Sequence, residues 1–416
     1  LADLDPEAAR NSTGELPVQL AQKTRQLLVR GRELLGRLKG LSTNLPPADA
    51  EDGDLWTAYQ QTVVLTELAL RSVQTFPSGT GEQLRLCQGL ELGLDLVEQR
   101  TRTLLAILDA RQRQRERLET LAHHLAALVQ GRPLHLKPFE ELAEALLREA
   151  QGGEPLRWQA ASAEQPECWA AAHCLNTAQL MARLARLDLE WRGGLAEAVL
   201  AALLHDAGMA AMPAELLGFD RLFKDEDRRQ MEAHVGLSAE AVRRLAPQEA
   251  WLVDVVRAHH ERIDGTGYPT GARGPAIPRL ARLLAVCDVY AALICPRPHR
   301  AALTPRAALT ETLLEAEKGR LDPDMAQLLL EVSFYPIGSL VELSDGAIGV
   351  VVATNPLGRD LSTPVRPVIR LVRDENGQAT ARATYVNLAQ CEGRHIVRGL
   401  TEDERRDVLG SSSWYL

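Results

Sequence analysis

The sequence is most informative at two places: residues 199–208 read VLAALLHDAG, and residues 259–269 read HHERIDGTGYP. The first stretch ends an apolar run with an adjacent imidazole and carboxylate. The second opens with two adjacent imidazoles and continues into a glycine-rich turn. The chain has ten histidines in 416 residues, and five of them lie between residues 173 and 260. Because such a grouping of ionisable side chains is costly in a merely structural protein, it predicts metal chemistry.

Three of the ionisable residues stand in stretches that are otherwise apolar. His173 lies within AAAHCL (170–175), Asp206 follows the apolar run quoted above, and Asp288 follows LLAVC (283–287). These stretches predict buried helices, where an ionised carboxylate is expensive unless it is paired or bound to a cation. Several such groups on separate helices imply one shared cation site.

The candidate metal ligands are five imidazoles and two carboxylates, namely His173, His205, Asp206, His234, His259, His260 and Asp288. This set suits two octahedral ions, and iron or manganese is favoured over the closed tetrahedral sites of structural zinc. Two ions about 4 Å apart, bridged by Asp206 and a hydroxide, would supply a nucleophile at neutral pH and clamp a phosphoryl oxygen. For His234, which has polar neighbours in the sequence, an exposed helix histidine is the alternative.

These elements resemble the HD-GYP branch of the HD phosphohydrolase superfamily. The matching segments are HDAG (205–208), HHE (259–261), DGTGYP (264–269), and Asp288 with RPHR (297–300) downstream. The resemblance extends over residues 165–335, which is under half of the chain.

The resemblance implies an all-helical domain that binds two or three metals and hydrolyses cyclic di-GMP to pGpG or GMP. The seven ligands match by position, with Asp206 as the bridging catalytic residue. The substrate-binding residues that it implies are Tyr268, Gly267, Arg297 and Arg300. Glu261 and Asp264 are expected to orient the histidines or the loop without touching the substrate.

The chain departs from the family pattern at several positions. Met209 stands where the family has a lysine, which removes a cation expected near the phosphate. Val235 replaces a proline, Ala214 replaces an aspartate, and His299 replaces a tyrosine. Members with a third metal carry a glutamate four residues before the first histidine, where this chain has Trp169. We therefore expect two metals and no third.

Three functions follow as hypotheses. The first is an active binuclear phosphodiesterase acting on a cyclic dinucleotide, which the complete ligand set favours. The second is a weak or inactive effector that binds metal and either nucleotide or a diguanylate-cyclase-type protein partner, which Met209 favours. The third is hydrolysis of another nucleotide, such as a mixed cyclic dinucleotide or a nucleoside monophosphate.

The remaining sequence predicts a mainly α protein with a small C-terminal antiparallel β-barrel-like domain. The predicted divisions are an N-terminal helical region (1–151), which is either a sensing or dimerisation module or an ordinary packed bundle, a linker (152–166), the catalytic domain (167–335), the β-domain (336–400) and a tail (401–416). Leucines at helical spacing support the first division. The helical pattern of the catalytic domain breaks at 193–194, 208–213 and 265–278. Short strands are expected at 339–343, 348–354, 368–373 and 384–388.

Composition excludes some partners. The formal net charge is −9, so no overall positive surface exists for duplex nucleic acid or an anionic membrane. No apolar run reaches the roughly 18 residues that a membrane span requires. Six cysteines without a Cys-x-x-Cys pair predict reduced thiols. Together with the absence of a secretory leader at Leu1, these features predict a cytoplasmic protein, with a homodimer through the N-terminal helices as one option.

Overall fold

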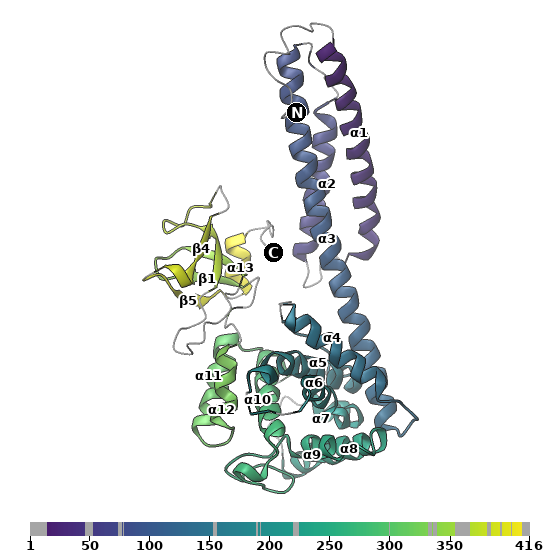
Figure 1. Cartoon of the computed structure of the whole chain (residues 1–416), viewed down its shortest axis with the longest axis vertical. Coiled ribbons are helices and arrows are strands. Elements are labelled where there is room, and N and C mark those ends of the chain that lie inside the picture. Colours follow the sequence, from purple (N-terminus) through teal and green to yellow (C-terminus); the bar gives the residue numbers. More distant parts are fainter. Residues whose placement is uncertain are drawn as a thin grey trace. The chain divides into compact units, whose positions relative to one another are not determined.

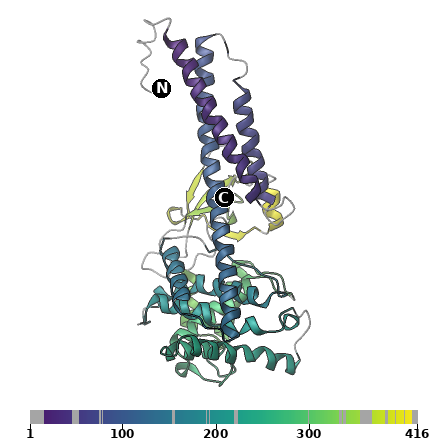
Figure 2. The ribbon, with the colours of Figure 1, turned by 90° about the vertical axis from the view of Figure 1, so that its right-hand side faces the viewer.

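The computed structural model describes most of the chain (Figures 1 and 2). The described residues are 15–45, 53–73, 77, 79–152, 156–188, 190–191, 193–218, 224–298, 300–331, 335, 339–353, 367–380, 384–391, 393–400 and 402–409. By its internal contacts the chain splits into two units, of which the first holds residues 1–114 and 401–416 and the second holds residues 115–400.

The first unit is built from long helices. They are α1 (Glu15–Leu41), followed by the 3-10 turn η2 (Ser42–Asn44), then α2 (Gly53–Arg71), the beginning of α3 (Thr80–Val129), and the short α13 (Glu402–Leu409). Leu27 and Leu34 on α1, and Leu90, Val97 and Leu104 on α3, recur at intervals of seven residues and are buried. A stripe at this spacing packs helices side by side, and here it forms the core of the unit.

Most of the second unit is helical. After the end of α3 its elements are α4 (Lys137–Gln151), α5 (Pro166–Leu184), η3 (Ala185–Leu187), α6 (Leu195–Leu204), η4 (Ala207–Ala211), α7 (Ala214–Leu217), α8 (Asp225–Leu245), α9 (Ala250–Ala258), η5 (Gly274–Ala276), α10 (Arg279–Ile294), α11 (Pro305–Glu317), α12 (Pro323–Gln327) and η6 (Leu328–Glu331). Helices α5, α6 and α10 are buried on nearly every side, so they form the centre of the bundle. The breaks predicted at 193–194, 208–213 and 265–278 all fall between or at the ends of these helices.

Helix α4 belongs to the same hydrophobic core. Its residues Phe139, Ala143 and Leu146 are buried and cluster with Leu121 and Leu125 from the end of α3 and with the apolar residues of α5 and α6. The sequence-based division placed α4 with the N-terminal region, at residues 1–151. The packing shows instead that α4 helps to bury the helices around it, and the border between the two units falls before it, within α3.

The C-terminal strands form one open antiparallel sheet. The strands are β1 (Leu340–Leu343), β2 (Ile348–Ala353), β3 (Val368–Arg373), β4 (Tyr385–Asn387) and β5 (Ile396–Gly399), in the order β4-β3-β2-β1-β5, with the 3-10 turn η7 (Leu388–Gln390) after β4. Val341, Val351 and Ile369 are fully buried beneath it. Among the described strands β4 and β5 lie at opposite edges, so the expected barrel-like closure is not confirmed. The sequence predicts the first four strands and misses β5.

Two further expectations concern composition. All six cysteines are free, as expected for reduced thiols. None of the helices in the described ranges combines the length and the apolar character that crossing a lipid bilayer requires.

Candidate metal centre

Three of the seven predicted ligands lie on helices of the second unit, and the other four directly follow two further helices. His173 lies on α5, His234 on α8 and Asp288 on α10; His205 and Asp206 follow the last turn of α6, and His259 and His260 follow the last turn of α9. His205 and His259 are completely buried. His234 is 2% exposed, so the alternative of an exposed helix histidine at this position is wrong.

The structure brings these side chains into two groups that can each hold a metal ion. One group is Asp206, His234, His259 and His260, and the other is His173, His205, Asp206 and Asp288. Within each group the candidate ligand atoms lie within 4.8 Å of one another. Asp206 belongs to both groups, which is the arrangement that a bridging carboxylate requires.

The two oxygens of Asp206 face different groups. Oδ1 lies 3.1 Å from Nε2 of His234 and 3.3 Å from Nε2 of His259. Oδ2 lies 3.5 Å from Nε2 of His173 and 3.6 Å from Nε2 of His205. The single carboxylate therefore presents one oxygen to each set of imidazoles.

Backbone hydrogen bonds fix the direction of three imidazoles. Nδ1 of His205 donates to the carbonyl of Ala202 at 2.8 Å, because the side chain folds back over the last turn of α6. Nδ1 of His234 and Nδ1 of His259 donate in the same way to carbonyls three residues earlier, at 2.5 Å and 2.6 Å. With the proton on Nδ1, the lone pair of each Nε2 points into the centre.

Unpartnered buried atoms show that this donor set fits a cation. Nε2 of His205, Nε2 of His259 and Oδ1 of Asp206 are buried without a hydrogen-bond partner in the described structure. Lone pairs that face one another without a proton between them repel, and buried polar atoms are normally satisfied. A divalent ion in each group would satisfy all of them at once.

The pKa values of four candidate ligands favour the protonation states that bind metal. Burial lowers the pKa of His205 to about 4, so its imidazole is neutral at neutral pH. Burial and the neighbouring His259 also lower the pKa of His260 well below its usual value. Burial alone would raise the pKa of Asp206 and of Asp288, but the surrounding imidazoles more than offset this and hold both carboxyl pKa values below their usual range. Neutral imidazoles and ionised carboxylates are the forms that coordinate metal. At His234 burial would lower the pKa, but the neighbouring carboxylate of Asp206 outweighs it and raises the pKa above its usual value.

Glu261 and Asp264 organise the loop that follows the histidine pair. The buried carboxylate of Glu261 accepts hydrogen bonds from the backbone N–H and the hydroxyl of Thr270, both at 2.7 Å, and from the N–H of Ala272 at 3.0 Å. Asp264 accepts from the N–H and the hydroxyl of Thr266 at 2.9 Å and 2.7 Å. Both carboxylates therefore hold the loop in shape, which agrees with an orienting role.

The loop carries the turn that the family resemblance assigns to substrate. A Cβ atom at Gly267 would lie 2.3 Å from the backbone nitrogen of Arg262 and 2.4 Å from the carbonyl oxygen of His260, so only glycine fits there. The Tyr268 ring lies 4.8 Å from the ring of His260, between centroids. The turn thus places Tyr268 directly beside His260, one of the candidate ligands.

Gly208 and Ser238 hold the segment after Asp206 against α8. The sequence analysis did not predict this role for Ser238. A Cβ atom at Gly208 would lie 2.2 Å from the carbonyl oxygen of His234, because η4 packs closely on α8. The N–H of Gly208 donates to the buried hydroxyl of Ser238 at 2.8 Å. This bond joins the segment after Asp206 to the helix that carries His234. The one signal that could have found Ser238 is its place in the sequence, one turn of helix after the candidate ligand His234.

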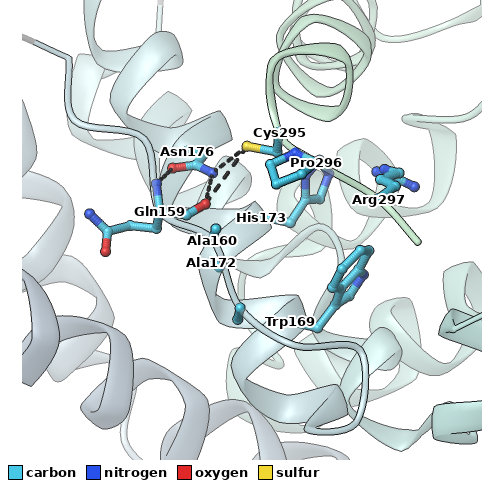
Figure 3. Close-up of a pocket in the computed structure, with 10 residues that line it drawn as sticks. Gln159, Ala160, Trp169, Ala172, His173, Asn176, Cys295, Pro296 and Arg297 are labelled. Carbon is cyan, nitrogen blue, oxygen red and sulfur yellow. Dashed lines mark hydrogen bonds between the residues drawn. The ribbon is translucent and has the colours of Figure 1, made fainter. Parts of the chain in front are cut away.

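The two predicted arginines lie in different surroundings. The guanidinium of Arg300 donates to the carbonyls of Ala292, Leu293 and Ala301, so it closes the C-terminal end of α10. Arg297 lies over the indole of Trp169, with its Cζ 5.7 Å from the ring centroid. Arg297, Trp169 and His173 all border one pocket (Figure 3). A contact of either arginine with substrate stays a prediction.

Comparisons with known proteins match two families and several relatives to this chain. The HD domain family matches residues 156–325, and the family described as a KOW domain associated with HD domain matches residues 340–407. A cyclic di-GMP phosphodiesterase of Pseudomonas aeruginosa is 38% identical over 194 residues, covering 46% of this chain and 46% of that protein.

Two further relatives cover less of the chain. A cyclic di-GMP phosphodiesterase response regulator of Xanthomonas campestris is 38% identical over 136 residues, covering 32% of this chain and 35% of that protein. A 3'3'-cGAMP-specific phosphodiesterase of Vibrio cholerae is 35% identical over 109 residues, covering 26% and 24%. The chain spans less than half the length of each of these three relatives. Residues 156–325 match the HD domain family and carry the Gly-Tyr-Pro turn, so this part of the chain is an HD domain of the HD-GYP type.

Proposed function

We propose that this protein is a metal-dependent phosphodiesterase that hydrolyses a cyclic dinucleotide, with cyclic di-GMP as the substrate and pGpG or GMP as the product. The observation that carries the proposal is the carboxylate of Asp206, which presents one oxygen to each of two buried groups of imidazoles. Relatives that act on cyclic di-GMP and on 3'3'-cGAMP support the class of substrate.

Two divalent ions fit the donor set, and we propose iron or manganese because nitrogen and oxygen ligands with open positions suit them. When bound, such ions supply Lewis acidity that polarises a phosphoryl oxygen and makes water a stronger acid at neutral pH. His173, His205 and Asp288 would hold one ion, and His234, His259 and His260 would hold the other, with Asp206 shared. Trp169 is not a ligand type, which supports two ions over three.

The chain's own residues position the reactants. Backbone-bonded imidazoles on separate helices keep the ligands in place without adjustment during the reaction. Tyr268 and Gly267 would form the wall that the substrate meets beside His260. Arg297 would contact a phosphate, because a guanidinium pairs well with phosphate oxygens.

Assay of the metal-reconstituted protein tests the proposal. Incubation with cyclic di-GMP, followed by chromatography of pGpG and GMP, should show turnover that stops on chelation. Parallel incubations with 3'3'-cGAMP and with nucleoside monophosphates identify the preferred substrate. Absence of product from every cyclic dinucleotide, with both ions bound, would reject the enzymatic proposal.

A second candidate is an effector that keeps metal and binds nucleotide, or a diguanylate-cyclase-type protein, without efficient turnover. Met209 favours it, because this side chain is only 7% exposed and packs in the hydrophobic core, so no cation stands at this position. Met209→Lys separates the two candidates. If only the missing cation limits an otherwise competent site, the variant should hydrolyse cyclic di-GMP faster. An unchanged or lower rate would show that the lack of a lysine at position 209 does not limit the rate.

We also propose that the first unit forms a homodimer. Leu92 and Leu96 lie one turn apart on α3 and are 71% and 45% exposed, so an apolar patch faces outward from the helix. Light scattering of the wild type should show a dimer, and the Leu92→Glu/Leu96→Glu double variant a monomer. A monomeric wild type would reject this part of the proposal.

A further inference from the structure

A small pocket adjoins the metal centre on the side of His173 (Figure 3). It lies between residues 159–161, the face of α5 that carries Trp169 and His173, and residues 295–297. Trp169 precedes His173 by four residues, so the two side chains share one face of α5. Anything that enters this pocket therefore comes into contact with a residue of the metal centre.

The backbone of the inner wall is already satisfied. Asn176 accepts from the N–H of Gln159 at 2.8 Å and donates to the carbonyl of Gln159 at 2.8 Å and to the sulfur of Cys295 at 3.1 Å. Gln179, one turn further along α5, makes the same pair of bonds with the N–H and carbonyl of Arg157. Two side-chain amides thus fasten the segment 157–159 to the helix, and they leave few donors for a ligand.

Arg297 supplies the charge at the edge of this pocket. Its backbone is fixed, because its N–H donates to the carbonyl of Arg300 at 2.8 Å and its carbonyl accepts from the N–H of Arg300 at 2.9 Å. Arg300 is in turn held by the end of α10. Within the described ranges no carboxylate lies at ion-pair distance from the Arg297 guanidinium, so its charge is available to an anionic ligand.

The contact that fixes the guanidinium itself is the indole of Trp169, whose centroid lies 5.7 Å from Cζ of Arg297. An arginine side chain is long and flexible, and stacking on an aromatic face restricts it without neutralising its charge. An aspartate or glutamate beside Arg297 would hold its guanidinium equally well, but the negative charge would cancel the positive charge of the guanidinium.

We propose that Trp169 is a positioning residue, which holds the guanidinium of Arg297 beside the metal centre so that it receives a phosphate of the cyclic dinucleotide. This inference rests on the proposed function and adds a residue to it. The cavity volume is about 30 Å³, room for one or two water molecules, so a nucleobase could enter this pocket only if its side chains moved. The pocket therefore suits an arrangement in which the indole acts through the arginine.

Kinetics of metal-reconstituted full-length variants test the proposal, with cyclic di-GMP as substrate. Trp169→Ala should raise KM about fivefold to tenfold, the size of a cation–π contact, with kcat changed by less than about twofold. Trp169→Phe keeps an aromatic face and should recover most of the loss.

The double variant Trp169→Ala/Arg297→Ala distinguishes positioning from direct contact. If the indole acts only through the guanidinium, the double variant should be no worse than Arg297→Ala alone. An additional loss from Trp169→Ala in the Arg297→Ala background would mean that the indole touches substrate itself, and would overturn the proposal. An unchanged KM for Trp169→Ala would overturn it as well.

Trp251→Ala is the matched control, because this half-buried indole lies on α9 and does not line the pocket. Its Nε1 donates a hydrogen bond to the carboxylate of Glu249 at 2.7 Å. This variant should leave KM unchanged, and metal content and melting temperature should be measured for every variant. If the wild type does not hydrolyse cyclic di-GMP, the proposed function fails, and calorimetric titration of the same variants with cyclic di-GMP still tests the inference. Equal affinities across the variants, or no binding by the wild type, would reject it.

Discussion

At the scale of single residues, the proposed chemistry depends most on the placement of one carboxylate. Asp206 is 4% exposed, follows a wholly buried turn of α6, and has imidazoles facing both of its oxygens. An ionised group in such surroundings is stable only when opposite charge surrounds it. A carboxylate shared by two cations would be stabilised by both of them. Asp206 belongs to both groups of candidate ligands, whereas each of the other six residues belongs to only one.

Asp206→Ala should therefore abolish metal binding and activity together. Elemental analysis should show the metal content falling from about two ions per chain toward none, since a bridging ligand serves both ions. Asp254 is exposed on α9, so Asp254→Ala is the control and should keep both metal binding and activity. A variant that retained both ions would show that Asp206 is not the bridge.

Gly208→Ala should destabilise the protein, whereas Gly236→Ala should not. The added methyl group at Gly208 meets the carbonyl oxygen of His234, and overpacking of this kind costs about 1–3 kcal/mol. At Gly236 on α8 nothing lies within 4 Å, so alanine should stabilise the helix by about 0.5–1 kcal/mol. Thermal unfolding of both variants measures the difference, and equal melting temperatures would contradict the close packing of η4 on α8.

At the scale of elements, helix ends and one loop bring the ligands together. Helices α6 and α9 both end directly before candidate ligands, and the imidazoles of His205 and His259 fold back on the last turn and donate to its carbonyls. The loop after α9 then needs internal support, because it has no helix of its own until α10. The carboxylate of Glu261 provides that support by accepting three hydrogen bonds from Thr270 and Ala272.

Glu261→Gln should loosen this loop. The amide presents an NH₂ group to one of the donors that the carboxylate satisfied, and an unsatisfied buried group costs about 1–3 kcal/mol. We expect a lower melting temperature and weaker binding of cyclic di-GMP, measured by thermal unfolding and calorimetry. Glu311→Gln, at an exposed position on α11, should change neither; a Glu261→Gln variant with wild-type stability would show that the loop does not depend on these bonds.

At the scale of the whole molecule, the metal centre joins helices that are distant in the sequence. His173 on α5 and Asp288 on α10 are separated by 115 positions and lie 2.8 Å apart between Nε2 and Oδ1. Ions bound between these helices would therefore add to the stability of the second unit, since only the folded chain assembles the ligands.

Removal of metal should lower the melting temperature of the second unit. An ion present at a hundred times its dissociation constant adds about 2.7 kcal/mol per site, so chelation should remove several kcal/mol. Differential scanning calorimetry with and without chelator measures the change. The Asp206→Ala variant should not respond to chelator, and a wild type equally indifferent to it would contradict a structural contribution of the metal.

The sequence by itself determined the helical class, the breaks between helices and the seven candidate ligands, because ionisable residues stand out in apolar stretches whatever the tertiary arrangement. That these seven side chains gather into two groups was decided by the tertiary structure. It did not determine that α4 packs against α5 and α6, that the C-terminal strands include β5 and stay open, or that the hydroxyl of Ser238 supports Gly208. Arg297 and Arg300 are alike in the sequence, yet one closes the end of α10 and the other stacks on Trp169. Such differences arise from side chains that meet across the fold, and spacing along the chain carries no information about which distant partner each side chain will find.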